Sequence, residues 1–319
     1  MNTAYIKMND ISKSFDGKTI VEGLSFDIAQ GDIVGLLGPN GSGKTTTVRL
    51  LNGVIRPDKG SLRVAGLDPQ TEGDGVRRIS GIVTEGAGLY HDMDAVQNLA
   101  FFGRLYGVKN RQRIAELLDL FELSEHADKP VGTFSTGMKK RLALAKAMLH
   151  EPELLFLDEP TNGLDPEGIR QVIGVLRKIN AERGTTILLC SHVLHQLEGL
   201  CRSYLFMEQG RIIERGTQTE LERKYLKQLK LRVTTGLAVS ADTAGDMTET
   251  SVMGALQGTF AGMPWVRTGP EQLEFTLPDR GAVSELLREL LAVTWVAAAE
   301  PAGRDLETLY FAVRGGRLK

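Results

Sequence analysis

The sequence predicts an α/β fold, in which a mixed or parallel sheet is covered by helices, followed by a small α+β domain. From residue 45 to 225, short apolar runs typical of buried strands alternate with stretches of helical spacing, which is the pattern of a sheet covered by helices. After residue 225 the runs become half-exposed and alternating. We therefore expect two domains, at residues 1–224 and 225–319.

The first domain begins with short strands and continues with alternating strands and helices. The run Ile33–Leu37 is continuously apolar and leads into glycines, as a buried parallel strand does. Helical spacing in Val96–Leu105 and Gln112–Phe121 predicts a helical insertion at about 86–150. Further strands are expected at Tyr5–Met8, Leu24–Ile28, Leu154–Leu157 and Thr186–Leu189.

The second domain has the pattern of a small mixed unit. Its expected elements are a strand at Leu229–Val233, a short helical stretch after Thr250, strands near Trp265 and at Leu273–Leu277, a helix at Ala282–Leu291, a strand at Val293–Ala298 and a terminal helix at Leu306–Val313. Up to that terminal helix, this order is compatible with a ferredoxin-like fold.

Composition excludes several classes of protein. Of 319 residues, 42% are hydrophobic and 24% charged, and the net charge of −2 argues against a nucleic-acid binder, which usually has a basic excess. Cys190 and Cys201 are predicted to be reduced, since no second Cys/His pair completes a metal site. Residues Met1–Asp10 do not resemble a signal peptide. No apolar run approaches the ~18 residues of a membrane-spanning helix, so we expect no membrane-spanning segment. If the protein acts at a membrane, we expect it to dock onto another protein that spans the bilayer.

A glycine-rich segment after the strand Ile33–Leu37 has the spacing of a phosphate-binding loop. Its glycines let the backbone aim N–H groups at a phosphate, and a helix beginning near Lys44 adds its positive dipole end. Lys44 would contact the β- and γ-phosphates of ATP, and Thr45 would offer a hydroxyl to Mg²⁺. A plain strand-to-helix glycine turn is the alternative. Nucleotide contacts are expected from Gly38, Pro39, Asn40, Gly41, Ser42, Gly43, Lys44, Thr45 and Thr46.

Two acids follow the apolar run Leu154–Leu157. A buried parallel strand delivers such residues to the carboxyl edge of the sheet, beside the phosphate-binding loop. Asp158 would hold Mg²⁺, directly or through a water, and Glu159 would act as the general base on the attacking water. The alternative is a strand that ends in a polar turn.

At this point the chain resembles the ATP-binding cassette (ABC) ATPases, over residues 3 to about 222. Phe134–Met138 is similar to the signature motif of that family, usually Leu-Ser-Gly-Gly-Gln, with departures at Phe134, Thr136 and Met138. Asn162–Pro166 is similar to its D-loop, and Ser191-His192 to its switch histidine. Phe15 stands where the family has an adenine-stacking aromatic residue.

The resemblance implies a head-to-tail dimer that encloses two ATP molecules. Ser135 and the N–H of Gly137, at the start of a helix expected at Met138–Leu149, would bind the γ-phosphate on the partner copy; a plain helix N-cap is the alternative for Ser135. His192 would contact the γ-phosphate and help orient the catalytic water. Asp165 would lie at the dimer interface, although its segment is also a good structural turn.

One further departure concerns Glu85, which stands where the family usually has a glutamine. A carboxylate can still ligate Mg²⁺ or hold its water, and it would bring a third acid near Asp158 and Glu159, raising some pKa by repulsion. Glutamate at this position is similar to exporter-type members of the daunorubicin-resistance group. The alternative is an exposed loop acid.

The resemblance favours the ATP-hydrolysing subunit of an ABC transporter that drives export and acts at the cytoplasmic face of the membrane. Its expected partners are separate transmembrane permease subunits and a second ATP-binding subunit, with a homodimer favoured. The segment Gly88–Met93 would receive the permease, with Phe101 and Phe102 either lining that groove or serving as helical core. A soluble ABC ATPase acting on ribosomes or DNA is the alternative, but the chain has one cassette and no sustained heptads. A regulator that hardly hydrolyses ATP is disfavoured by Lys44, Asp158 and Glu159.

Overall fold

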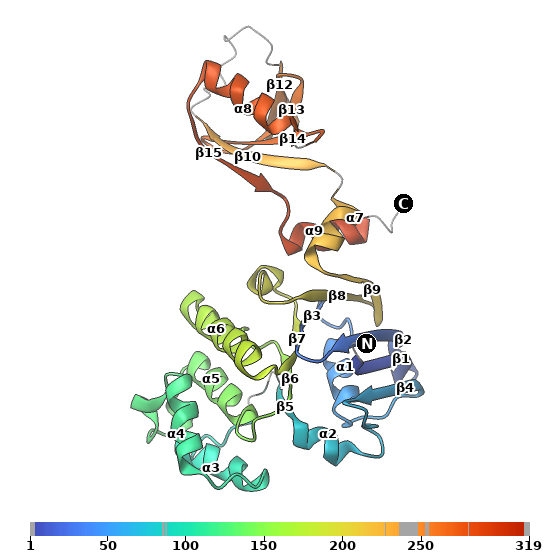
Figure 1. Ribbon diagram of the computed structural model, residues 1–319, viewed down its shortest axis with the longest axis vertical. Helices are drawn as coiled ribbons and strands as arrows, with labels where there is room; N and C mark the ends of the chain where they lie inside the picture. Colours follow the sequence, from blue (N-terminus) through green and yellow to red (C-terminus); the bar gives the residue numbers. More distant parts are fainter. Residues whose placement is uncertain are drawn as a thin grey trace. The chain divides into compact units, whose positions relative to one another are not determined.

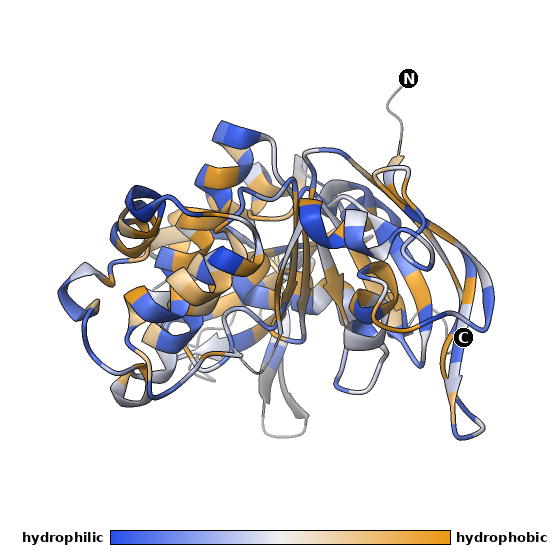
Figure 2. Ribbon diagram, turned by 90° about the horizontal axis from the view of Figure 1, so that it is seen from below, coloured by the Kyte–Doolittle hydropathy of each residue, from blue (hydrophilic) through white to orange (hydrophobic). Residues whose placement is uncertain are grey.

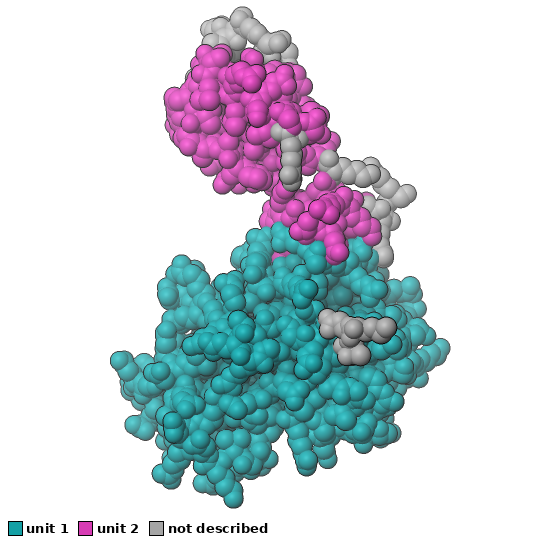
Figure 3. Space-filling view, in the orientation of Figure 1, with its two compact units in different colours: residues 1–218 teal, residues 219–319 magenta. Residues whose placement is uncertain are grey.

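The structure is a computed structural model that describes residues 4–84, 86, 88–226, 228–235, 248–252, 255–279 and 281–315. The chain divides into two compact units, Met1–Gln218 and Thr219–Lys319 (Figure 3). The nucleotide-binding motifs all belong to the first unit.

An antiparallel sheet opens the first unit. Its strands are β1 (Ala4–Phe15), β2 (Lys18–Ala29) and β4 (Lys59–Val64), in the order β2-β1-β4. The first two strands are longer than the short runs expected from the sequence, because β1 pairs along both of its edges and buries Ile6, Met8 and Ile11.

A second sheet carries the functional motifs. Its order is β5-β6-β7-β3-β8-β9, and all neighbours are parallel except the last pair. The predicted buried strands are confirmed, since every residue of β3, β6 and β7 is buried. Residues that follow these strands therefore meet at one edge of the sheet. The strands are β3 (Ile33–Leu37), β5 (Ser80–Val83), β6 (Leu154–Asp158), β7 (Thr186–Ser191), β8 (Ser203–Glu208) and β9 (Arg211–Gly216).

Helices pack around this sheet, and a group of them forms the helical part of the unit. Figure 1 shows α3, α4 and α5 on the side of the second sheet away from β1, β2 and β4. Helix α3 begins with a capping box between Asp94 and Gln97. The helices are α1 (Lys44–Leu51), α2 (Gly73–Ile79), α3 (Ala95–Leu105), α4 (Arg111–Leu120), α5 (Thr136–Ala147) and α6 (Pro166–Arg183).

Helix α5 begins two residues earlier than Met138, the expected start, and ends two residues earlier than Leu149. The reason is the cap: the Ser135 hydroxyl accepts a hydrogen bond from the Met138 backbone N–H at 3.2 Å. An N-cap satisfies a donor two or three residues ahead, so Gly137 lies inside the first helical turn.

One core joins the two sheets of the first unit. It includes Ile6 and Phe26 from the antiparallel sheet together with Leu36, Phe156 and Leu188 from the second sheet. Figure 2 shows the apolar residues concentrated along these central strands. A close-packed core of this kind holds the ends of β3, β6 and β7 in fixed positions.

The described residues of the second unit form an antiparallel sheet. Its strand order is β11-β12-β13-β14-β10-β15. Helix α8 packs against this sheet with the spaced residues Ala282, Leu286 and Leu290, which contact the cluster around Trp265 and Phe275. The elements are α7 (Gln218–Tyr225), β10 (Leu229–Thr235), β11 (Thr248–Val252), β12 (Ala255–Phe260), β13 (Met263–Gly269), β14 (Gln272–Leu277), α8 (Gly281–Val293), β15 (Val296–Ala302) and α9 (Leu306–Gly315).

Two expectations for this unit are wrong. Between Thr250 and Trp265 the described residues form the hairpin β11–β12, not a short helix, because β12 pairs with β11 and β13. Such pairing overrides the helical preference of Ala255 and Leu256. Helix α8 also continues to Val293, so the last strand begins at Val296.

None of the helices in the described ranges combines the length and the apolar character that crossing a membrane requires.

Candidate functional site

The segment Gly38–Thr45 connects β3 to α1 and has a backbone that requires glycine. Gly41 and Gly43 have φ angles of 77° and 109°, in the left-handed region that disfavours side chains. At Gly38 a methyl group would overlap the carbonyl oxygen of Met207. The loop is also held from outside, since the Gly210 N–H donates to the Ser42 carbonyl at 2.9 Å.

Two polar groups of this loop fit a phosphate. The Lys44 ammonium is buried and donates to the carbonyls of Gly38 at 2.7 Å and Pro39 at 3.1 Å. Ser42 Oγ is buried and has no hydrogen-bond partner within the described residues. A buried hydroxyl without a partner is costly, and a phosphate oxygen would supply one.

Thr45 and Asp158 contact each other directly. The Thr45 hydroxyl donates to Asp158 Oδ2 at 2.7 Å, although the two residues are far apart in the sequence. Asp158 ends β6 and is buried. One hydroxyl and one carboxylate suit Mg²⁺, which prefers oxygen ligands and keeps waters and phosphate oxygens. The described part of the chain has no group of three or more His, Cys, Asp and Glu residues placed for a metal.

Glu159 has a fixed side chain at the same edge of the sheet. Its φ of 51° is unusual for a residue with a side chain. Its carboxylate lies 2.8 Å from His192 Nδ1, accepts from Ser191 Oγ at 3.2 Å, and is 4.0 Å from Lys44 Nζ. Because Ser191 ends β7 and His192 follows it, the strand pairing of β6 and β7 creates this arrangement.

These residues open into a cleft of about 630 Å³. Of the predicted site residues, nine line it: Asn40, Gly41, Gly43, Lys44, Thr45, Thr46, Asp158, Glu159 and His192. Phe15 does not line the cleft: its side chain is exposed, and Lys13 Nζ lies 5.3 Å from its ring centre. Four further lining residues belong to no motif of the sequence: Lys18, Thr19, Ile20 and Gln209. Asn162, the first residue of the segment similar to the D-loop, also lines the cleft.

Ser135, Gly137 and Asp165 line a different hollow, of about 510 Å³. It shares no lining residue with the first cleft. Ser135 is the N-cap of α5, and Asp165 is the N-cap of α6, accepting from the Gly168 N–H at 2.8 Å. Within one chain the structure therefore does not bring these three residues to the phosphate-binding loop.

Comparisons with known proteins agree with this geometry. The family described as ABC transporter matches residues 21–162. The Nod factor export ATP-binding protein I of Paraburkholderia xenovorans (strain LB400) is 40% identical over 224 residues, which cover 69% of this chain and 73% of that protein. The chain belongs to the ATP-binding subunits of ABC transporters.

Two further similarities extend the comparison for this ABC subunit. The daunorubicin/doxorubicin resistance ATP-binding protein DrrA of Streptomyces peucetius is 39% identical over 223 residues, covering 69% of this chain and 67% of that one. A solved structure of an ATP-binding subunit of an ABC transporter has a TM-score of 0.65 and 29% identity, and it covers 70% of this chain and 93% of that one. The ABC subunit is thus an ATPase of a transporter, and the ribosome- or DNA-acting alternative receives no support.

Glu85 of the ABC subunit lies outside the described residues. The segment that follows is half-exposed and aromatic: the ring centroid of Tyr90 lies 5.0 Å from that of Phe101 and 5.8 Å from that of Phe102. Lys146 Nζ donates to the Gly88 carbonyl at 3.0 Å and lies 4.6 Å from the centre of the Phe102 ring. Burial lowers the pKa of Lys146 to about 8.

Proposed function

We propose that this ABC subunit holds ATP and Mg²⁺ between the Gly38–Thr45 loop and the acids at the end of β6. Lys44 and the unpartnered Ser42 hydroxyl would bind phosphate oxygens, and Thr45 with Asp158 would hold the metal. Held by these two residues, Mg²⁺ would supply positive charge that offsets the charge of the phosphates. Phe15 would stack on the adenine, a role that its exposed ring permits.

The observation that carries hydrolysis is the position of Glu159. Its carboxylate is held between Ser191 and His192 and lies 4.0 Å from Lys44. A general base needs a fixed orientation within hydrogen-bond reach of the water it activates. Glu159 would take the proton of the attacking water, and His192 would hold that carboxylate and contact the γ-phosphate.

A second copy of the chain completes the site in this proposal. Ser135 and Gly137 line a hollow separate from the phosphate-binding loop of their own chain. Two copies related by a two-fold axis can place each hollow over the other copy's nucleotide. The Ser135 hydroxyl, the Gly137 N–H and Asp165 would then face the partner's ATP, so ATP would join the copies and hydrolysis would release them.

The proposed transport role follows from the relatives. A relative at 40% identity is named for Nod factor export, and another at 39% for daunorubicin/doxorubicin resistance. We infer that this homodimer drives export through separate membrane permease subunits, at the cytoplasmic face of the membrane. Tyr90, Phe101 and Phe102 form a half-exposed aromatic surface that a permease segment would contact. Glu85 would ligate Mg²⁺ or hold its water and would sense the permease, a role proposed from the sequence alone.

The Glu159→Gln variant tests the hydrolytic part. The amide keeps the size of the side chain but cannot accept a proton, so ATP should bind and remain uncleaved. We expect ATP hydrolysis to fall at least about 100-fold, and an ATP-dependent dimer to accumulate in sedimentation velocity. Normal turnover by this variant would remove Glu159 from its role, and a monomer at saturating ATP would contradict the dimer.

A cross-linking experiment tests the permease contact. A photoreactive group attached at Tyr90→Cys should label a multi-spanning membrane protein in native membranes. The same group at Arg63→Cys, on β4 of the antiparallel sheet, is the matched control and should not label it. Labelling of ribosomal proteins instead, or equal labelling from both positions, would contradict this part of the proposal.

A further inference from the structure

Helices α5 and α6 both begin at the hollow that contains Ser135 and Asp165. Ser135 caps α5 and Asp165 caps α6. Arg141 lies six residues after the cap Ser135, and Gln171 lies six residues after the cap Asp165. Both side chains line the same hollow. The two helices therefore present their caps and this pair of side chains to one region.

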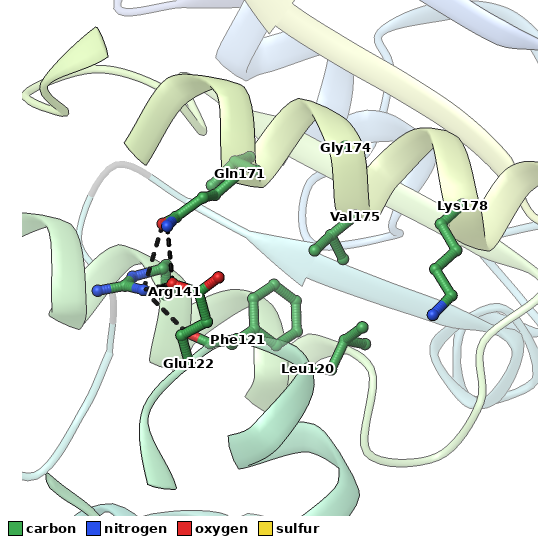
Figure 4. A pocket seen from close by; sticks show the side chains of 9 residues that line it. Leu120, Phe121, Glu122, Arg141, Gln171, Gly174, Val175 and Lys178 are labelled. Atoms are coloured by element: carbon green, nitrogen blue, oxygen red, sulfur yellow. Dashed lines mark hydrogen bonds and ion pairs between the residues drawn. The ribbon is translucent and has the colours of Figure 1, made fainter. Parts of the chain in front are cut away.

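Arg141 and Gln171 form a three-residue cluster with Glu122. Arg141 Nη1 lies 3.3 Å from Gln171 Oε1 and 3.5 Å from Glu122 Oε2, and it donates to the Phe121 carbonyl at 3.1 Å. Gln171 Nε2 donates to the same Glu122 oxygen at 2.7 Å. Figure 4 shows these side chains converging from α6, α5 and the end of α4. Each member contacts the other two, so the cluster is a closed triangle.

The backbone presents Glu122 to this cluster. Glu122 follows the end of α4 with a φ of 53°, and its N–H donates to the Asp119 carbonyl at 2.9 Å. This left-handed turn ends the helix and redirects the chain. The side chain of Arg141 is 18% exposed and that of Glu122 is 63% exposed. Water therefore weakens the hydrogen bonds from Arg141 to Phe121 and Gln171, which are partly buried, less than the contacts with Glu122.

The loops at the tips of the two helices also lie close together. A side chain at Gly163 would meet the Thr136 methyl group at 3.3 Å, and one at Gly137 would meet Leu164 at 3.5 Å. Thr136 stands where the family usually has glycine, and its methyl group fills the space above the Gly163 turn. The signature and D-loop segments are thus close at their tips, and their helices are linked by hydrogen bonds at the cluster.

We propose that Arg141, Gln171 and Glu122 are positioning residues that hold the signature segment and the D-loop as one unit, so that both reach the partner's nucleotide together. This inference rests on the proposed ATP-dependent dimer. If the two segments moved independently, each would have to be ordered when the dimer forms, and that ordering costs affinity. Because the cluster already orders both segments in the single copy, this loss of affinity does not occur when the dimer forms. Substitutions in the cluster should leave the affinity of a single copy for nucleotide unchanged.

The test uses the full chain in the Glu159→Gln background, where ATP should hold the dimer. We expect Arg141→Met and Gln171→Met each to weaken ATP-dependent dimerisation at least about ten-fold, measured as the dimer dissociation constant in sedimentation velocity. Affinity of the monomer for a fluorescent ATP analogue should change less than about two-fold. Arg141→Lys keeps a charged donor and should retain most of the dimer affinity.

A double variant and a control make the test specific. The double variant Arg141→Met with Gln171→Met should lose little more dimer affinity than the single variant that loses more, because both changes break the same cluster. Arg177→Met is the matched control: it lies on α6, donates to the Gly199 carbonyl at 3.3 Å and lines neither hollow. This control should dimerise like its parent.

The outcomes separate this inference from the proposed function. If the Glu159→Gln parent forms no ATP-dependent dimer, the proposed function fails and the inference fails with it. If the parent dimerises and Gln171→Met dimerises equally well, only the inference is overturned. Equal losses of monomer nucleotide affinity and dimer affinity would also overturn it. Should Arg141→Met fail to fold, Gln171→Met alone decides, since its side chain is partly exposed.

Discussion

His192 Nδ1 lies 2.8 Å from Glu159 Oε1, which joins the two residues proposed to orient and activate water. A carboxylate accepts hydrogen bonds, so Nδ1 carries the hydrogen in this pair. His192 follows β7 and Glu159 follows β6, and neighbouring parallel strands bring them to the same edge. The pair is therefore a product of the sheet order, and each residue restricts the orientation of the other.

His192→Ala should slow hydrolysis by about 10- to 100-fold with little change in the KM for ATP. The reason is that the variant frees the Glu159 carboxylate to rotate, while the phosphate-binding loop keeps its contacts. Steady-state kinetics at saturating Mg²⁺ would show this as a fall in kcat. A rise in KM at unchanged kcat would mean that His192 only binds the nucleotide.

Asp158→Asn should raise the Mg²⁺ concentration required for half-maximal ATPase activity by about 10- to 100-fold. An amide is a weaker metal ligand than a carboxylate. The present carboxylate accepts a hydrogen bond from the Thr45 hydroxyl, whereas the NH₂ group of the amide could only donate to that hydroxyl. Titration of activity with Mg²⁺ at constant ATP measures the effect. Thr45→Val should shift the titration in the same direction; an unchanged Mg²⁺ requirement in both variants would exclude this metal site.

Gly38→Ala should lower the free energy of unfolding by about 2–3 kcal/mol, because a methyl group would overlap the Met207 carbonyl oxygen. Gly41→Ala should cost only about 1–2 kcal/mol, since its space is open and the cost comes from a φ of 77°. Asparagine tolerates that conformation, so Gly41→Asn should be milder than Gly41→Ala, whereas Gly38→Asn should be worse than Gly38→Ala. Urea unfolding distinguishes the two mechanisms, and equal effects at both glycines would contradict them.

Lys146→Met should change stability in a pH-dependent way. Burial lowers the pKa of Lys146 from 10.5 to about 8, so the folded protein releases this proton more easily than the unfolded chain does. The charged lysine therefore costs folding free energy below about pH 8, and the cost disappears as the pH rises to 10.5. Relative to Lys146→Met, the unaltered protein should gain stability over that range. A difference between the two proteins that stays constant from pH 7.5 to 10.5 would refute this assignment.

The amino-acid sequence determined the parts of this protein that depend on short segments. Local patterns show the buried strands Ile33–Leu37 and Leu154–Leu157, the helix after the phosphate-binding loop, and the two acids that follow the second strand. Such patterns are sufficient because strand burial, glycine conformation and helix capping each involve a few neighbouring residues. The motifs in these short segments are sufficient to indicate the ABC ATPase family.

Only the tertiary structure decided the relations between distant segments. The contact of Thr45 with Asp158, the cleft-lining Gln209 and the Arg141–Gln171 pair join residues between 30 and more than 100 positions apart. The hairpin β11–β12 replaced an expected helix for the same reason, because its neighbours in the sheet determine its conformation. Local preference amounts to a fraction of a kcal/mol per residue, roughly, and pairing and packing against distant parts of the chain outweigh it.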